Sequence, residues 1–189
     1  RRQRQMCIRD SLALSALDFD LSVYDIFGLL SVGGSLVLLS EQTRREATIW
    51  REMIERYKVT LWNSVPALLE MLLISNVEKS ELSSLRLAMV SGDWVGLDLL
   101  ERLEKVAPQT KLFALGGATE AAIWSNVFPV TEVASGWKSI PYGTPLENQC
   151  YRVVDSLGRD RPNGVPGELW IGGSGCLLYT SDAADECHS

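Results

Sequence analysis

The sequence predicts an α/β fold, in which a mostly parallel sheet covered by helices is followed by the start of a smaller β-rich, barrel-like element. Between residues 35 and 115, short β-type runs alternate with stretches of helical periodicity, which is the pattern of a parallel sheet with covering helices. After residue 126, proline and glycine interrupt the chain, and strand-like runs succeed one another without helices between them. The second pattern indicates an antiparallel or barrel-like element.

The expected elements can be placed in chain order. A strand is expected over 35–39, introduced by two glycines, and an amphipathic helix over 47–57, where Trp50, Met53, Ile54 and Tyr57 recur at helical spacing. A strand over 59–62 leads to a helix capped by Ser64, with Pro66 in its first turn. The remaining elements are a strand over 85–90, a helix over 97–106, and strands over 111–115, 149–154 and 167–172.

Composition excludes several classes of protein. A hydrophobic share of 46% and a charged share of 22% are those of an ordinary globular protein, and the net charge of −6 argues against a nucleic-acid surface. No apolar run reaches the roughly 18–20 residues that span a bilayer, so no membrane association and a cytoplasmic location are expected. The one histidine, His188, stands beside the end of the sequence. Catalytic triads, Cys–His dyads and multi-histidine metal sites are therefore not expected.

The expected domain organisation has four parts. Residues 11–128 form the α/β part and residues 129–175 the β-rich part. Residues 1–10 and 176–189 fit neither periodicity nor domain logic and are interpreted as non-native flanks, similar to translated adapter sequence.

Four segments of the α/β part place small or polar residues at strand ends, where open parallel sheets bind ligands. In 18–25, a helix cap is favoured over a carboxylate that turns inward to meet a cation. Segments 62–66 and 90–93 are each either an ordinary βα turn or a site whose backbone amides bind a ring or an anion. In 115–120, paired glycines stand beside a Thr hydroxyl and a Glu carboxylate, which can bind a phosphate oxygen and magnesium.

Three motifs in order resemble those of the adenylate-forming enzyme superfamily, specifically the adenylation domains of nonribosomal peptide synthetases. Residues 19–22 (Phe-Asp-Leu-Ser) resemble the family's Phe-Asp-x-Ser motif, and residues 115–120 resemble Tyr-Gly-Pro-Thr-Glu in the variant Gly-Gly-Ala-Thr-Glu. Residues 167–175 match Gly-Glu-Leu-x-Ile-x-Gly-x-Gly. The resemblance covers residues 11–175 and implies the large N-terminal domain of such an enzyme, in part.

The resemblance implies a substrate pocket. It assigns Asp20 to the α-ammonium of an amino acid, which reverses the preference for a cap, because an ion pair there selects amino acids over plain acids. The other pocket positions that it implies are Leu21, Tyr24, Asn63, Met89, Ser91, Leu115, Ile123 and Trp124. Together they read D-L-Y-N-M-S-L-I-W, which is similar to the signature of cysteine-activating domains, where the fifth position is usually Leu. Asn63 and Ser91 can offer polar contacts near a thiol, while core packing is the alternative role for Met89, Leu115 and Ile123.

The resemblance also implies ATP and Mg²⁺ as cofactors. Gly92, Asp93 and the backbone of Gly116, Gly117 and Ala118 would flank the adenine. Thr119 would contact the α-phosphate and Glu120 would ligate magnesium, so these two are the expected catalytic residues. The amino-acid carboxylate attacks the α-phosphorus and gives aminoacyl-AMP and pyrophosphate, with positioning and charge neutralisation carrying the rate. The phosphopantetheine thiol of a carrier domain then takes the aminoacyl group, and condensation or heterocyclisation domains are the expected neighbours.

The sequence departs from the family pattern in two respects. Gly116 stands where the family's Tyr stacks on adenine, so that stacking must be supplied by another residue. The family's phosphate-binding loop, its ribose-binding Asp and its C-terminal Lys have no counterpart in residues 1–189. This polypeptide by itself is therefore expected to be inactive.

Two other functions are compatible with parts of the pattern. An acyl- or aryl-acid ligase of the same superfamily would have no ammonium to pair, so Asp20 argues against it. A non-catalytic α/β nucleotide-binding module would need no magnesium-holding pair beside its glycines, so Thr119 and Glu120 argue against that alternative.

Overall fold

A computed structural model describes residues 10–75 and 82–176. The chain divides into two compact units. One comprises residues 1–114 and 129–141, and the other comprises residues 115–128 and 142–189. Most of the two predicted flanks, residues 1–9 and 177–189, lies outside the described residues. Asp10, the last residue of the predicted N-terminal flank, begins the first strand.

The first unit is built on a parallel sheet. Its strands run in the order β2 (Ser35–Val37), β1 (Asp10–Leu12), β3 (Leu61–Ser64), β4 (Leu87–Val90) and β5 (Lys111–Gly116), of which residues 111–114 belong to this unit. Each neighbouring pair is parallel. Parallel strands that are buried on both faces usually read as nearly continuous apolar runs. The fully buried strand β3 departs from this pattern, because it ends in two polar residues, Asn63 and Ser64.

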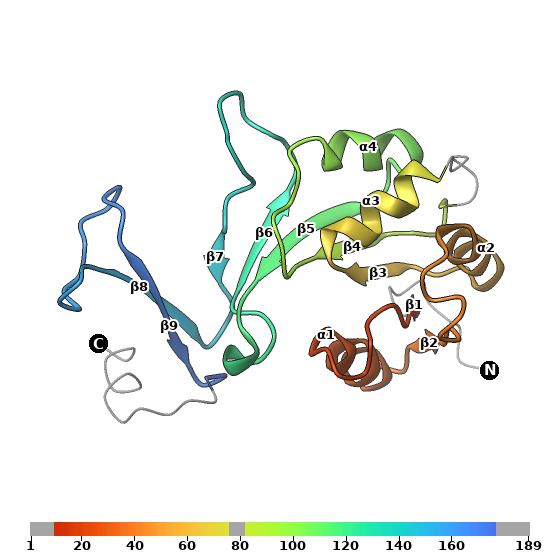
Figure 1. The fold of residues 1–189 in the computed structure, drawn as a ribbon, viewed down its shortest axis with the longest axis horizontal. Coiled ribbons are helices and arrows are strands. Elements are labelled where there is room, and N and C mark those ends of the chain that lie inside the picture. Colours follow the sequence, from red (N-terminus) through yellow and green to blue (C-terminus); the bar gives the residue numbers. More distant parts are fainter. Residues whose placement is uncertain (1–9, 76–81, 177–189) are drawn as a thin grey trace. The chain divides into compact units, whose positions relative to one another are not determined.

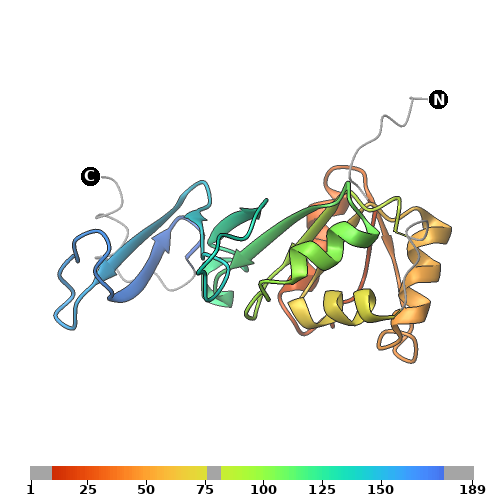
Figure 2. The same cartoon turned by 90° about the horizontal axis from the view of Figure 1, so that it is seen from above.

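Helices cover this sheet. Figures 1 and 2 show α2 (Ala47–Tyr57), α3 (Pro66–Ile74) and α4 (Leu99–Val106) side by side, with α3 contacting both others. The short α1 (Leu21–Val23) lies apart from these three and continues directly into a π-helical turn, η1 (Tyr24–Gly28). None of the helices in the described residues combines the length and apolarity needed to cross a bilayer.

The core of the first unit forms between the sheet and α2, α3 and α4. Trp50 of α2 meets Trp62 of β3 edge to face, with ring centroids 5.8 Å apart. The fully buried apolar side chains include Ile54, Leu69, Leu72, Leu99 and Leu103 from the three helices. Within the predicted apolar stripe of α2, Tyr57 is exposed, and the Arg56 guanidinium stacks over its ring. The buried face of α2 is therefore narrower than predicted.

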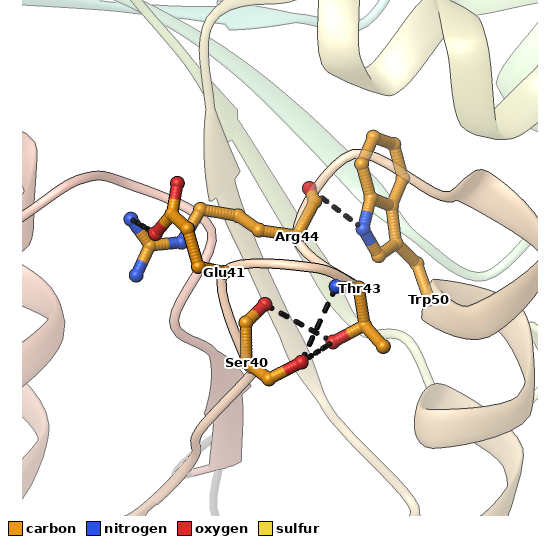
Figure 3. A network of polar contacts seen from close by, with 5 residues as sticks. All are labelled: Ser40, Glu41, Thr43, Arg44 and Trp50. Carbon is orange, nitrogen blue, oxygen red and sulfur yellow. Dashed lines mark hydrogen bonds and ion pairs between the residues drawn. The ribbon is translucent and has the colours of Figure 1, made fainter.

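The loop before α2 is held by hydrogen bonds of its own (Figure 3). The Ser40 hydroxyl lies 2.9 Å from that of Thr43 and accepts a hydrogen bond from the Thr43 backbone amide. The Trp50 indole donates to the Arg44 carbonyl at 3.1 Å. Because Trp50 is buried, this last bond ties the loop to the core and fixes where α2 begins, although Glu46 makes no side-chain cap there.

One predicted cap is wrong. Ser64 is the last residue of β3 rather than the cap of α3, and its hydroxyl donates to the Val65 carbonyl. Val65 occupies the N-cap position with an extended backbone and no capping side chain. Pro66 alone marks the start of the helix, as its fixed φ and missing N–H allow at a first helical position.

The second unit is β-rich. Asn126 and Val127 of β6 (Asn126–Val130) pair antiparallel with β7 (Thr144–Pro145), and β8 (Gln149–Val154) pairs antiparallel with β9 (Glu168–Gly173). A short 3₁₀ turn, η2 (Thr119–Ala121), precedes β6. The predicted fold class, a mostly parallel sheet with helices followed by a smaller antiparallel part, is confirmed.

Candidate functional site

The predicted site residues fall in both units. In the first unit, Leu21 and Tyr24 come from α1 and η1, while Asn63 and Met89 lie on β3 and β4, directly opposite one another in the sheet register. Ser91 follows the end of β4. Since β3 and β4 are parallel, their carboxyl ends meet at one sheet edge, where open α/β sheets bind ligands.

Asp20 stands at the N-cap position of α1 but makes no side-chain cap hydrogen bond. The capping role that local sequence favours is therefore not the one its carboxylate performs. Asp18, in the same segment, is exposed, whereas Asp20 is half-buried. Of these two carboxylates, Asp20 has the environment that suits pairing with a bound cation.

Among the described residues, Asp25 is the most deeply buried acidic side chain, and sequence reasoning did not single it out. It is 1% exposed, and burial raises its pKa to about 7, although a hydrogen bond from Asn63 lowers it. The Asn63 amide Nδ2 donates to Asp25 Oδ1 at 2.9 Å, and Asn63 is 0% exposed. The other two oxygens of the pair, Asp25 Oδ2 and Asn63 Oδ1, are buried without a hydrogen-bond partner.

The ring of Tyr24 lies over Gly28 within the π-helical turn. A Cβ at position 28 would come within 2.8 Å of the ring, so glycine is what lets the ring adopt this place. Burial, and secondarily the negative charge of Asp25, raise the pKa of Tyr24. Tyr24 is thus held as a neutral phenol beside the buried carboxyl.

Three of the predicted segments meet at the turn after β4. Gly92, with φ of +84°, lies against Val65 and the Phe19 ring, which its missing Cβ would contact at 3.4 and 3.8 Å. Gly92 and Asp93 are exposed, and Asp93 accepts a hydrogen bond from the Trp94 amide at 2.7 Å. The backbone beside Phe19 is therefore open to a ligand, as a nucleotide contact by this turn requires.

In the second unit, the segment from Leu115 to Trp124 forms a tight loop. A Cβ on Gly117 would come within 2.8 Å of the backbone around Trp124, so the chain can close only on glycine. The Ser125 amide donates to the Gly116 carbonyl at 2.8 Å and closes the loop. Ile123 has φ of +74°, which is unusual for a β-branched residue and marks a strained position. The residues predicted to face the substrate here sit on backbone fixed by this closure.

Thr119 and Glu120 begin η2, and both are exposed. Among the described residues, no group of three or more His, Cys, Asp or Glu side chains could hold a metal ion. A single accessible carboxylate is nevertheless what Mg²⁺ needs when phosphate oxygens and water supply its other ligands. Glu120 therefore fits a magnesium ion that arrives with a nucleotide.

Tyr142 fills the space beside Gly116, a relationship that sequence reasoning missed. A Cβ on Gly116 would collide with the Tyr142 ring and lie 2.7 Å from Asn126 Oδ1. Asn126 Nδ2 donates to the Tyr142 carbonyl, and the Tyr142 ring stacks on Tyr151 with centroids 6.0 Å apart. The Tyr151 hydroxyl in turn lies 2.7 Å from the Ser125 hydroxyl. The Tyr142 ring thus occupies the space that a side chain at position 116 would need.

Comparison with known proteins bears on this arrangement. The family model described as AMP-binding enzyme matches residues 4–178. The chain belongs to that family. The predicted identity, part of an adenylation domain of the nonribosomal peptide synthetase type, is confirmed by this match and by the solved structures it resembles.

Two relatives and one structure illustrate the similarity. The chain is 59% identical over 169 residues to the anguibactin system regulator of Vibrio anguillarum, covering 88% of this chain and 16% of that protein. It is 56% identical over 164 residues to pyochelin synthetase PchE of Pseudomonas aeruginosa, covering 86% of this chain and 11% of that protein. The AMPPNP-bound nonribosomal peptide synthetase FmoA3 superposes with a TM-score of 0.85 at 43% identity, over 90% of this chain and 19% of that one. The chain thus spans less than a fifth of the length of each.

Proposed function

We propose that this chain is the part of an adenylation domain that selects L-cysteine and activates it as cysteinyl-AMP for a carrier-domain phosphopantetheine thiol. The observation that carries the proposal is Asp20, a half-buried carboxylate at the start of α1 that does not cap the helix. Asn63 and Ser91, both buried at strand ends, supply polar groups for a thiol-bearing side chain. FmoA3, a structural relative, has also been solved bound to α-methyl-L-serine-AMP, the adenylate of an amino acid with a small polar side chain.

The nucleotide contacts are proposed within each unit. Gly92 and Asp93 are the proposed adenine contacts of the first unit. Gly116, Gly117 and Ala118 are those of the second unit, where Thr119 contacts the α-phosphate. Glu120 holds Mg²⁺, which neutralises the developing phosphate charge. Tyr142 supplies the stacking ring that Gly116 cannot, since its ring occupies the space beside that glycine. Neighbouring condensation or heterocyclisation domains and a cytoplasmic location stay predictions.

The test is amino-acid-dependent ATP–pyrophosphate exchange by the full-length protein across the proteinogenic amino acids. L-Cysteine should give the highest kcat/KM. Asp20→Ala should lower kcat/KM for cysteine by about 100-fold or more, because the substrate ammonium loses its charged partner.

Asp18→Asn is the matched control, because Asp18 is an exposed carboxylate two positions away. It should leave exchange unchanged. Undiminished exchange by the Asp20→Ala protein would show that the ammonium binds elsewhere. A preference of the wild-type protein for a plain carboxylic acid over amino acids would instead favour an acyl- or aryl-acid ligase.

A further inference from the structure

The Asp25–Asn63 pair contains a residue that the proposed reaction does not yet explain. Asp25 lies in η1 and Asn63 on β3, so the hydrogen bond between them joins the turn to the sheet. Among the described residues no cation pairs with Asp25, and Asn63 is the one side chain that donates to it. A buried carboxyl with so few partners is costly to maintain, which calls for a specific role.

The pair fixes the orientation of the Asn63 amide. An asparagine side chain can present either its oxygen or its NH₂ group in a given direction, because the two ends have the same shape. Nδ2 faces Asp25 and donates to its Oδ1 at 2.9 Å, and the ionised form of Asp25, which can only accept, holds the amide in this orientation. The amide oxygen is consequently directed elsewhere and is left as an acceptor.

That acceptor has no donor from the protein. Asn63 Oδ1 is buried without a hydrogen-bond partner, and the Asn63 residue as a whole is 0% exposed. Buried polar atoms in native proteins are nearly always hydrogen-bonded, so a group that enters the site is expected to bring the missing donor. Asn63 lies opposite Met89 in the sheet register, so its neighbour on the adjacent strand is an apolar side chain that offers no hydrogen-bond donor.

We propose that Asp25 is a positioning residue for amino-acid selection: it holds the Asn63 amide so that the oxygen accepts a hydrogen bond from the bound side chain. The side chain selected in this way carries a donor such as S–H, and an alkyl side chain of the same size leaves the oxygen unpaired. This inference rests on the proposed function, since it takes Asn63 to line the substrate pocket.

The test compares L-cysteine with L-2-aminobutyrate, in which a methyl group replaces the thiol, in pyrophosphate exchange by the full-length protein. Wild type should prefer cysteine. Asp25→Ala should reduce the ratio of the two kcat/KM values by about tenfold, the effect of one lost neutral hydrogen bond. Asn63→Ala should reduce it equally, and the double variant should reduce it no further, because both changes remove the same oriented oxygen.

Asp98→Asn is the control, since Asp98 is an exposed carboxylate that pairs with Arg102 on α4. It should leave the ratio unchanged. If Asp25→Ala slows both substrates equally, the residue is merely structural and the proposal is wrong. If Asp25→Ala does not fold, the wild-type ratio still decides, because equal use of cysteine and 2-aminobutyrate would exclude an oriented acceptor. A wild-type protein that activates no cysteine at all would contradict the proposed function instead.

Discussion

The ring of Tyr142 lies against the backbone of Gly116, in space that any larger residue at position 116 would need. Asn126 binds the backbone of Tyr142, and Tyr151 stacks on its ring, so the ring is held from two sides. The absence of a side chain at 116 and the presence of a ring at 142 are thus two parts of one arrangement.

Gly116→Ala should destabilise the protein by about 1–3 kcal/mol, because the added methyl group overpacks a filled site. Equilibrium unfolding in urea measures the loss. Gly96→Ala is a suitable control, since the atoms nearest to a Cβ there are the ends of the flexible Asp98 and Glu70 side chains. Adding Tyr142→Ala to Gly116→Ala should cost less than the sum of the single changes, and simple additivity would show that the two residues do not compete for space.

Tyr142→Leu should raise the KM for ATP about tenfold while leaving the KM for the amino acid unchanged, because stacking of a base on an aromatic ring contributes roughly 1–3 kcal/mol. Pyrophosphate exchange by the full-length protein at varied ATP measures this. Trp170→Leu, a change at an exposed aromatic residue of the same unit, provides the comparison. An unaltered KM for ATP would remove Tyr142 from the nucleotide site.

Asp25→Asn should flatten the dependence of stability on pH. The folded-state pKa of Asp25 is about 7, above the unfolded value near 3.9, so the folded protein binds the extra proton between these values. Stability attributable to this group therefore falls as pH rises from 4 to about 8, by about 2 kcal/mol between pH 5.5 and 8, and is constant above that. Urea unfolding of both proteins across this range gives the difference, with the variant more stable at pH 7.5. Parallel curves for the two proteins would show that Asp25 titrates normally.

Glu120→Gln should lower kcat and raise the Mg²⁺ concentration at half-maximal exchange, because the amide keeps the shape but loses the charge that holds the ion. The KM for cysteine should not change. Glu132→Gln, at an exposed carboxylate of the first unit, is the comparison. Equal magnesium requirements in the Glu120 variant and wild type would contradict the metal assignment.

Most elements of the fold could be predicted because their signals are local. The α2 helix occupies the predicted residues 47–57, and β8 the predicted residues 149–154, since each is a complete periodic run bounded by polar or turn residues. Predicted strand and helix ends elsewhere differ by at most two residues, as at Leu99, where α4 starts after Asp98 rather than at 97. Ser64 was misassigned because a serine before Pro66 has the local pattern of a cap, although tertiary pairing with Val90 keeps it in the strand.

The site could be predicted only where a motif carries it. Asp20, Thr119 and Glu120 stand in recognisable segments, whereas Asp25 acquires its importance from a contact with Asn63 across the fold. Tyr142 and Gly116 likewise meet through tertiary structure. The π-helical geometry of η1 was also missed, because residue periodicity of 3.6 does not distinguish one wider turn. Tyr142 in the sequence downstream of Gly116 could indicate a replacement for the missing ring, but only the fold shows that the two residues lie together.

The π-helical turn also makes the pocket sensitive to chain length. Side chains after a wide turn are out of phase with those before it, so deleting one residue between Tyr24 and Gly28 would restore ordinary helical spacing. Every side chain beyond the deletion would rotate by about 100° about the helix axis, while Asp20 and Leu21 upstream would keep their places. Deletion of Asp25 itself would thus exchange the buried partner of Asn63 without altering Asp20, the residue proposed to meet the substrate ammonium.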